Sequence, residues 1–162
     1  MKSIRLAVSA LIVAGLAIVN PASATVTRQI GVAGAFVPNK ADQAFWDNTS
    51  GAATVVDGAN INAYHYGFTT IPIESGPASF PNVSAELTTT GGSAGASQVC
   101  YALYTMGRTG SLSAFTGSTC SSGSATHIQV LSNSLSVGNG DAVLVNIAAQ
   151  HNGKAKYLDF TY

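Results

Sequence analysis

The stretch AVLVNIAAQHNGKAKYLDFTY, residues 142–162, carries the strongest fold signal in the sequence. Two runs of alternating apolar and polar residues flank Asn152-Gly153, a dipeptide that favours the type I′ turn of a two-residue β-hairpin. Closing the turn there sets the pairing, so that Ile147 faces Leu158 and both side chains lie on one side of the hairpin. This side is apolar, and the sequence therefore predicts that it enters a hydrophobic core.

The opposite side of the predicted hairpin suggests a ligand site. The register puts Tyr157, Asp159 and Thr161 side by side on this outer side, with Asn146 directly across from Asp159. Ala155 is expected on the same side. A phenol beside a carboxylate and an amide offers the apolar contact and hydrogen bonds that sites for polar ligands use, although a solvated outer face would show the same pattern. We add Trp46, the single tryptophan, which would either stack on a sugar or fill the core.

Short alternating segments separated by Gly, Pro and Asn turn signals recur along the rest of the chain. We expect strands over residues 26–37, 52–56, 61–68, 83–90, 98–106, 112–115, 127–131, 142–148 and 154–162. A short helical turn is expected around residues 40–46. Strands of this length and spacing predict a single all-β domain, a two-sheet antiparallel sandwich that is jelly-roll-like, with an immunoglobulin-like sandwich as the second choice.

The N-terminus has the pattern of a secretory signal peptide. Two basic residues precede the apolar run 6–19, and Ala22-Ser23-Ala24 forms a small-residue cleavage site. The run is shorter than an ordinary membrane-spanning helix, and no later run approaches that length. We therefore expect residues 1–24 to be removed and residues 25–162 to form a secreted domain, located in the periplasm, outside the cell or on its surface.

Composition limits the possible partners. The whole chain has 162 residues, of which 9% are charged and 46% hydrophobic, and its formal net charge is zero. Without residues 1–24, five basic and seven acidic side chains remain, a net charge of −2. Such a chain lacks the basic stripe that nucleic-acid binding usually needs and is too apolar for a disordered polyelectrolyte.

The two cysteines predict one structural crosslink. Cys100 and Cys120 both lie in the exported part, and neither has CxxC spacing or a nearby base. In an oxidising compartment two such cysteines are most simply a disulfide. We expect this bond to fix the Gly/Ser/Thr-rich loop 116–124 to the strand that carries Cys100.

Motifs for catalysis and metal binding are weak. Residues 91–95, GGSAG, match the G-x-S-x-G elbow of serine hydrolases, but a strand rather than the required helix follows, so we interpret them as a loop. His65, His127 and His151 lack the spacing of a metal site. The oxygen-rich segment 138–141 could hold a structural calcium ion, and no other cofactor is expected. The chain therefore looks non-enzymatic.

Several functions fit these features. We expect a non-catalytic extracellular binding module for a glycan or another surface ligand. The main alternative is a self-assembling subunit of a filament, coat or adhesive layer, whose partners would be copies of itself, because few lysines protect the strand edges. Two lesser alternatives are a secreted hydrolase and a small outer-membrane barrel, whose closing strand the alternation of Leu158, Phe160 and Tyr162 resembles.

Overall fold

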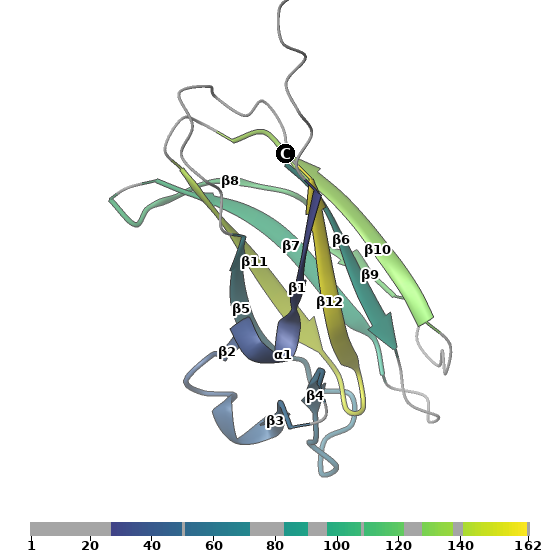
Figure 1. Cartoon of the computed structure of the whole chain (residues 1–162). Coiled ribbons are helices and arrows are strands. Elements are labelled where there is room, and N and C mark those ends of the chain that lie inside the picture. Colours follow the sequence, from purple (N-terminus) through teal and green to yellow (C-terminus); the bar gives the residue numbers. More distant parts are fainter. Residues whose placement is uncertain are drawn as a thin grey trace, which may run out of the picture.

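Two antiparallel sheets pack face to face as a sandwich in the computed structural model, which confirms the predicted fold class (Figure 1). The structure describes residues 27–49, 51–71, 83–90, 97–107, 109–121, 128–137 and 141–161. The predicted signal peptide and the GGSAG segment lie outside these residues. Within the described ranges, no helix has the length and apolar character that a membrane crossing requires.

Among the described residues, each sheet contains six strands. Sheet A consists of β1 (Thr27–Gly31), β3 (Trp46–Asp47), β4 (Ala53–Val55), β6 (Val83–Thr90), β10 (Ile128–Leu135) and β12 (Lys154–Thr161). Sheet B consists of β2 (Val37–Pro38), β5 (His65–Ile71), β7 (Val99–Met106), β8 (Leu112–Phe115), β9 (Thr119–Cys120) and β11 (Ala142–Ala149). The two described helices are short: α1 (Val32–Ala35) and η1 (Gln43–Phe45), the latter at the predicted helical turn.

The strand order is that of a jelly roll. Leaving aside the short strands β2, β3, β4 and β9, the sheets run β1-β12-β6-β10 and β5-β11-β7-β8. Counted along the chain, these are the first, eighth, third and sixth strands in one sheet and the second, seventh, fourth and fifth in the other. Both sheets arise from two interlocked Greek keys, which is the jelly-roll arrangement.

The core lies between the sheets and follows the period of two. In β6, Val83, Ala85 and Leu87 are buried whereas Ser84 and Glu86 are exposed, as the alternation predicts. The two sheets supply the largest buried side chains together: Leu87, Leu158 and Phe160 from sheet A, and Ile71, Tyr101, Leu103 and Ile147 from sheet B. The inner faces thus form one continuous core, and burial of this apolar surface is the main stabilising term.

The predicted hairpin at Asn152-Gly153 is wrong. β11 pairs with β5 and β7 in sheet B, whereas β12 pairs with β1, β4 and β6 in sheet A. Asn152 has a φ of 63°, Gly153 is not among the positive-φ residues, and Gly153 N donates to Gln150 O at 2.8 Å, so the turn is not type I′. Ile147 and Leu158 are both buried as expected, but they enter the core from opposite sheets. Packing the two strands face to face lets the apolar side of each cover the other.

Two further predictions need correction. The expected strand 26–37 is interrupted by α1, where the chain leaves sheet A for sheet B and buries Val32 and Phe36. The register of β12 against β6 shifts between Ala155 and Tyr157. This bulge turns Ala155 inward, so that it is buried rather than on the outer side.

The disulfide prediction is confirmed. Cys100 and Cys120 are directly paired residues of β7 and β9, and their sulfur atoms are bonded at 2.05 Å. Cys120 lies in this short strand rather than in an irregular loop. The bond therefore ties the segment after β8 to the start of β7.

Candidate functional site

Four hydrogen-bonding side chains form a row across the outer face of sheet A. The row runs from Gln29 in β1 through Asp159 in β12 and Glu86 in β6 to Ser132 in β10, and each neighbouring pair occupies directly paired positions. Tyr157 lies two positions before Asp159 on the same side of β12. We call these five residues the polar face.

The two acids of the polar face are cross-strand neighbours. Gln29 Nε2 donates to Asp159 Oδ1 at 2.7 Å, and Ser132 Oγ donates to Glu86 Oε1 at 3.4 Å. Like charges at directly opposed positions destabilise a sheet. Within the described residues, neither acid forms a salt bridge that would offset this repulsion. The carboxylates therefore keep oxygen lone pairs available for hydrogen-bond donors from outside.

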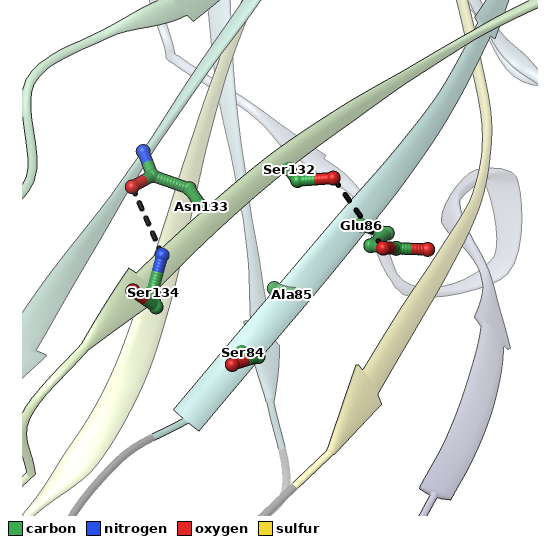
Figure 2. A pocket seen from close by; sticks show the side chains of 6 residues that line it. All are labelled: Ser84, Ala85, Glu86, Ser132, Asn133 and Ser134. Atoms are coloured by element: carbon green, nitrogen blue, oxygen red, sulfur yellow. Dashed lines mark hydrogen bonds between the residues drawn. The ribbon is translucent and has the colours of Figure 1, made fainter.

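A pocket lies beside Glu86. It has a volume of about 430 Å³ and is lined by Ser84, Ala85, Glu86, Ser132, Asn133 and Ser134. Figure 2 shows the Ser132 hydroxyl directed toward Glu86 across the gap between the two strands. Asn133 is held separately, because its Oδ1 accepts from Ser134 N at 3.0 Å. The lining is rich in hydroxyl groups, which both donate and accept hydrogen bonds.

The residues singled out from the sequence lie in three places. Tyr157 and Asp159 are on the polar face, where Tyr157 is 46% exposed. Asn146 is on the outer face of sheet B, so its predicted position opposite Asp159 is wrong, because β11 and β12 belong to different sheets. Trp46 is buried with its ring centre 4.5 Å from that of Phe36, which is the core-filling alternative. The role of these residues in ligand binding stays a prediction.

Sequence reasoning missed Gln29, Glu86 and Ser132. The alternation of β6 does predict that Glu86 points outward. Its neighbours come from segments about 50 to 70 residues away along the chain, and no local pattern specifies which strands pair over such distances. The sequence therefore indicates that single residues such as Glu86 point outward, but it does not indicate that the four side chains form a row.

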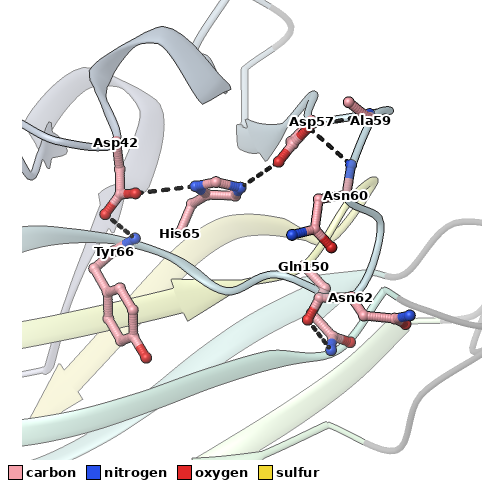
Figure 3. Close-up of polar contacts among 8 residues, drawn as sticks. All are labelled: Asp42, Asp57, Ala59, Asn60, Asn62, His65, Tyr66 and Gln150. Carbon is pink, nitrogen blue, oxygen red and sulfur yellow. Dashed lines mark hydrogen bonds and ion pairs between the residues drawn. The ribbon is translucent and has the colours of Figure 1, made fainter.

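A buried histidine forms the second polar cluster (Figure 3). His65, which is 5% exposed, has its Nδ1 3.0 Å from Asp42 Oδ1 and its Nε2 3.0 Å from Asp57 Oδ2. Asp42 Oδ2 also accepts from Tyr66 N at 3.0 Å. The ring of Phe45 covers His65, with the ring centres 4.3 Å apart. Since both ring nitrogens are engaged by carboxylates, His65 is not placed to act as a free general base.

Asp57 anchors the loop before β5. Its Oδ1 accepts from the backbone N–H groups of Ala59 and Asn60, both at 3.1 Å. Burial acts to raise the pKa of Asp57, but the hydrogen bonds from Asn60, His65 and Ala59 outweigh it and hold the pKa below its usual value. The cluster thus joins this loop to β5 and acts as a structural brace.

No group of three or more His, Cys, Asp or Glu side chains among the described residues is arranged to hold a metal ion. Asp141 is described, but residues 138–140 of the predicted calcium segment are not. The structural calcium ion therefore stays a prediction.

Comparison with known proteins identifies the fold without identifying a family. The sequence matches no family model and no curated protein. The structure is similar to part of the Arthrobacter globiformis T6 isomalto-dextranase complexed with panose, with a TM-score of 0.50 and 10% identity over 83% of this chain and 23% of that one. It is similar to the same extent, TM-score 0.50 and 12% identity, to part of the enzymatically active domain of tailspike protein 4 of bacteriophage CBA120, over 85% of this chain and 19% of that one. The chain spans less than a quarter of either protein.

Proposed function

We propose that this protein is a secreted, non-catalytic β-sandwich that binds an extracellular glycan on the polar face. The observation that carries the proposal is the row Gln29–Asp159–Glu86–Ser132, with the exposed Tyr157 beside it. Sugars present hydroxyl groups at their edges and C–H groups on the faces of their rings. Carboxylates, an amide and a serine suit the hydroxyl groups, and an aromatic ring suits the C–H face.

The dimensions of the row fit an oligosaccharide. Three strand spacings separate Gln29 from Ser132, a length of about 14 Å. Asp159 and Glu86 lie in the middle of it with free lone pairs, where they would accept hydrogen bonds from sugar hydroxyls. The pocket of about 430 Å³ beside Glu86 adds the hydroxyl groups of Ser84 and Ser134.

Tyr157 has room for a stacked sugar. Its directly paired residue in β1 is Gly31, which has no side chain to cover the ring, and a Cβ at Gly31 would meet nothing within 4 Å. A tyrosine side chain contributes about 150–250 Å² on burial, so an exposed fraction of 46% leaves about 100 Å² accessible. Covering half of that area is worth about 1 kcal/mol, or about fivefold in Kd.

Binding to a panel of soluble polysaccharides and to a glycan array tests the proposal. Panose and α-glucans belong in the panel, because the similar isomalto-dextranase was solved with panose. For a glycan that binds, calorimetry on Tyr157→Ala should give a Kd about fivefold higher. Tyr66→Ala is the matched control, because Tyr66 is 43% exposed on the other sheet, and its Kd should equal that of the wild type.

The acid pair provides a second test. Glu86→Gln and Asp159→Asn keep the shape of the side chains and remove the negative charge, so each should weaken binding through poorer hydrogen-bond acceptance. The proposed site would be contradicted if no glycan of the panel binds. It would also be contradicted if the variants of the polar face bind as tightly as the wild type. Release of reducing sugar ends on prolonged incubation would instead show that the protein cleaves its ligand, which would contradict a non-catalytic role.

A further inference from the structure

The outer face of sheet B is apolar and uncharged. Val37 and Phe115 are 64% and 56% exposed, and Phe68, Leu144 and Tyr104 lie between them across the sheet. Among the described residues, no outward side chain of β2, β5, β7, β8 or β11 carries a charge. We call these five residues, together with Asn146 at their centre, the apolar face. A contiguous exposed surface of this kind marks an interaction site.

We propose that the apolar face is a homodimer interface, closed by a two-fold axis that passes near Asn146. In a two-fold interface each patch meets an identical patch, so a charge near the axis would meet a like charge. A face without charged side chains avoids this repulsion. It therefore suits a second copy of the same chain.

Asn146 provides the specific feature of this interface. It lies midway along β11, the central strand of the sheet, with Phe68 and Ala102 as its directly paired neighbours. Its side-chain amide has no hydrogen-bond partner within the described part of the chain. A primary amide both donates and accepts, so two Asn146 side chains across the axis can bond to each other reciprocally. Single polar residues in apolar interfaces set the register between chains in the same way.

The available area suits a weak, reversible dimer. The strands β5, β7 and β11 are about 25 Å long and together about 14 Å wide, and the shorter β2 and β8 add about 100 Å², which gives about 450 Å² on each copy. Two copies would bury about 900 Å², just below the size of a stable interface. We therefore expect a reversible dimer with a Kd in the micromolar range.

A pocket within the apolar face supports tight packing of side chains from the second copy. It has a volume of about 310 Å³ and is lined by Ala35, Val37, Phe68, Thr69, Thr70 and Leu144. Tyr104 and Phe115, whose ring centres lie 4.8 Å apart, stand on the other side of Leu144. An alternation of hollows and aromatic side chains lets two copies interdigitate.

Sedimentation velocity on the purified, oxidised protein from micromolar to millimolar concentration tests this interface. The wild type should change from the mass of one chain to that of two. Leu144→Lys places a charge near the axis on a residue that is solvent-accessible in the monomer, and it should raise the dimer Kd at least about tenfold. Val130→Lys is the matched control, because Val130 is 55% exposed on sheet A, and its Kd should not change.

Asn146→Asp gives an independent test with almost no change in shape. At neutral pH it would replace the amide pair with two carboxylates, so the dimer Kd should again rise at least about tenfold. If Leu144→Lys does not fold, the dimer Kd of Asn146→Asp alone tests the interface. A wild type that remains monomeric at millimolar concentration, an assembly larger than two chains, or a dimer that neither variant weakens would each overturn the proposal.

Discussion

A methyl group added at Gly67 should destabilise the fold by a steric mechanism that the structure specifies. Gly67 lies in the middle of β5 and points into the core, where a Cβ would stand 1.9 Å from Cζ of Phe36 and 2.5 to 2.6 Å from the adjacent ring carbons. Phe36 cannot simply move away, because it is buried and its ring packs against Trp46. Gly67 is not among the glycines with positive φ, so the backbone itself accepts alanine.

The expected magnitude follows from these contacts. Overpacking costs about 1–3 kcal/mol, and an approach below 2 Å belongs at the upper end of that range. Replacing glycine also lowers the conformational entropy of the unfolded chain, which offsets up to about 1 kcal/mol of this cost. Gly67→Ala should therefore lower the free energy of unfolding by about 2 kcal/mol. Phe36→Ala alone should cost about 3–5 kcal/mol by leaving a cavity.

The double variant tests the cause. The methyl group of Gly67→Ala would occupy space that Phe36→Ala vacates, so together the two changes should cost at least about 2 kcal/mol less than the sum of the single costs. Urea unfolding followed by the fluorescence of Trp46 measures all three variants. Gly31→Ala is the matched control: this strand glycine has nothing within 4 Å of its Cβ position, so its stability should stay near the wild-type value. Additive costs, or a Gly67→Ala variant as stable as the wild type, would refute the argument.

Three further predictions concern stability. The pKa of Asp57 is lower in the folded than in the unfolded state, so the contribution of this carboxylate to folding stability is present above about pH 4 and is lost as pH falls through the folded pKa. The variant Asp57→Asn should therefore lose less stability than the wild type between pH 5 and pH 3, as measured by chemical unfolding. Replacing Cys100 and Cys120 by serine should cost about 3 kcal/mol, and the intact mass of the wild type should not change on alkylation without reductant. Thr69→Val should raise the free energy of unfolding by up to about 1 kcal/mol, because the buried Oγ1 has no hydrogen-bond partner among the described residues; a loss of stability would contradict this.

The strands could be predicted where a local period specifies them. In β6 the alternation alone gives the buried set of Val83, Ala85 and Leu87. The same reasoning groups Cys100 with Ala102 and Tyr104 on one side of its strand, and Cys100 meets Cys120 there. These properties depend on which way successive side chains point, and a strand fixes that direction without reference to the rest of the fold.

The turn at Asn152-Gly153 shows why the remainder could not be predicted. A turn signal states that the chain reverses, but it does not state whether the second strand pairs with the first or packs against it from another sheet. In this fold β12 pairs with β1 and β6, and these partners lie far away in the sequence. Because β12 pairs with β1 and β6, Asn146 and Asp159 lie on opposite outer faces, and Glu86 lies beside Asp159.

The jelly-roll topology also separates the two proposed functions in space. The polar face and the apolar face are the outer sides of different sheets, so a glycan and a second copy of the chain would not compete for the same surface. A dimer formed through the apolar faces turns its two polar faces away from each other. Such a dimer would connect two glycan chains instead of binding one chain twice, because no single chain could reach both sites without wrapping around the assembly. Beads coated with a glycan that binds should therefore aggregate with the wild type but not with Leu144→Lys, although both proteins should bind the soluble glycan with equal Kd. Bead aggregation by Leu144→Lys would show that a dimer formed through the apolar face is not what connects the glycan chains.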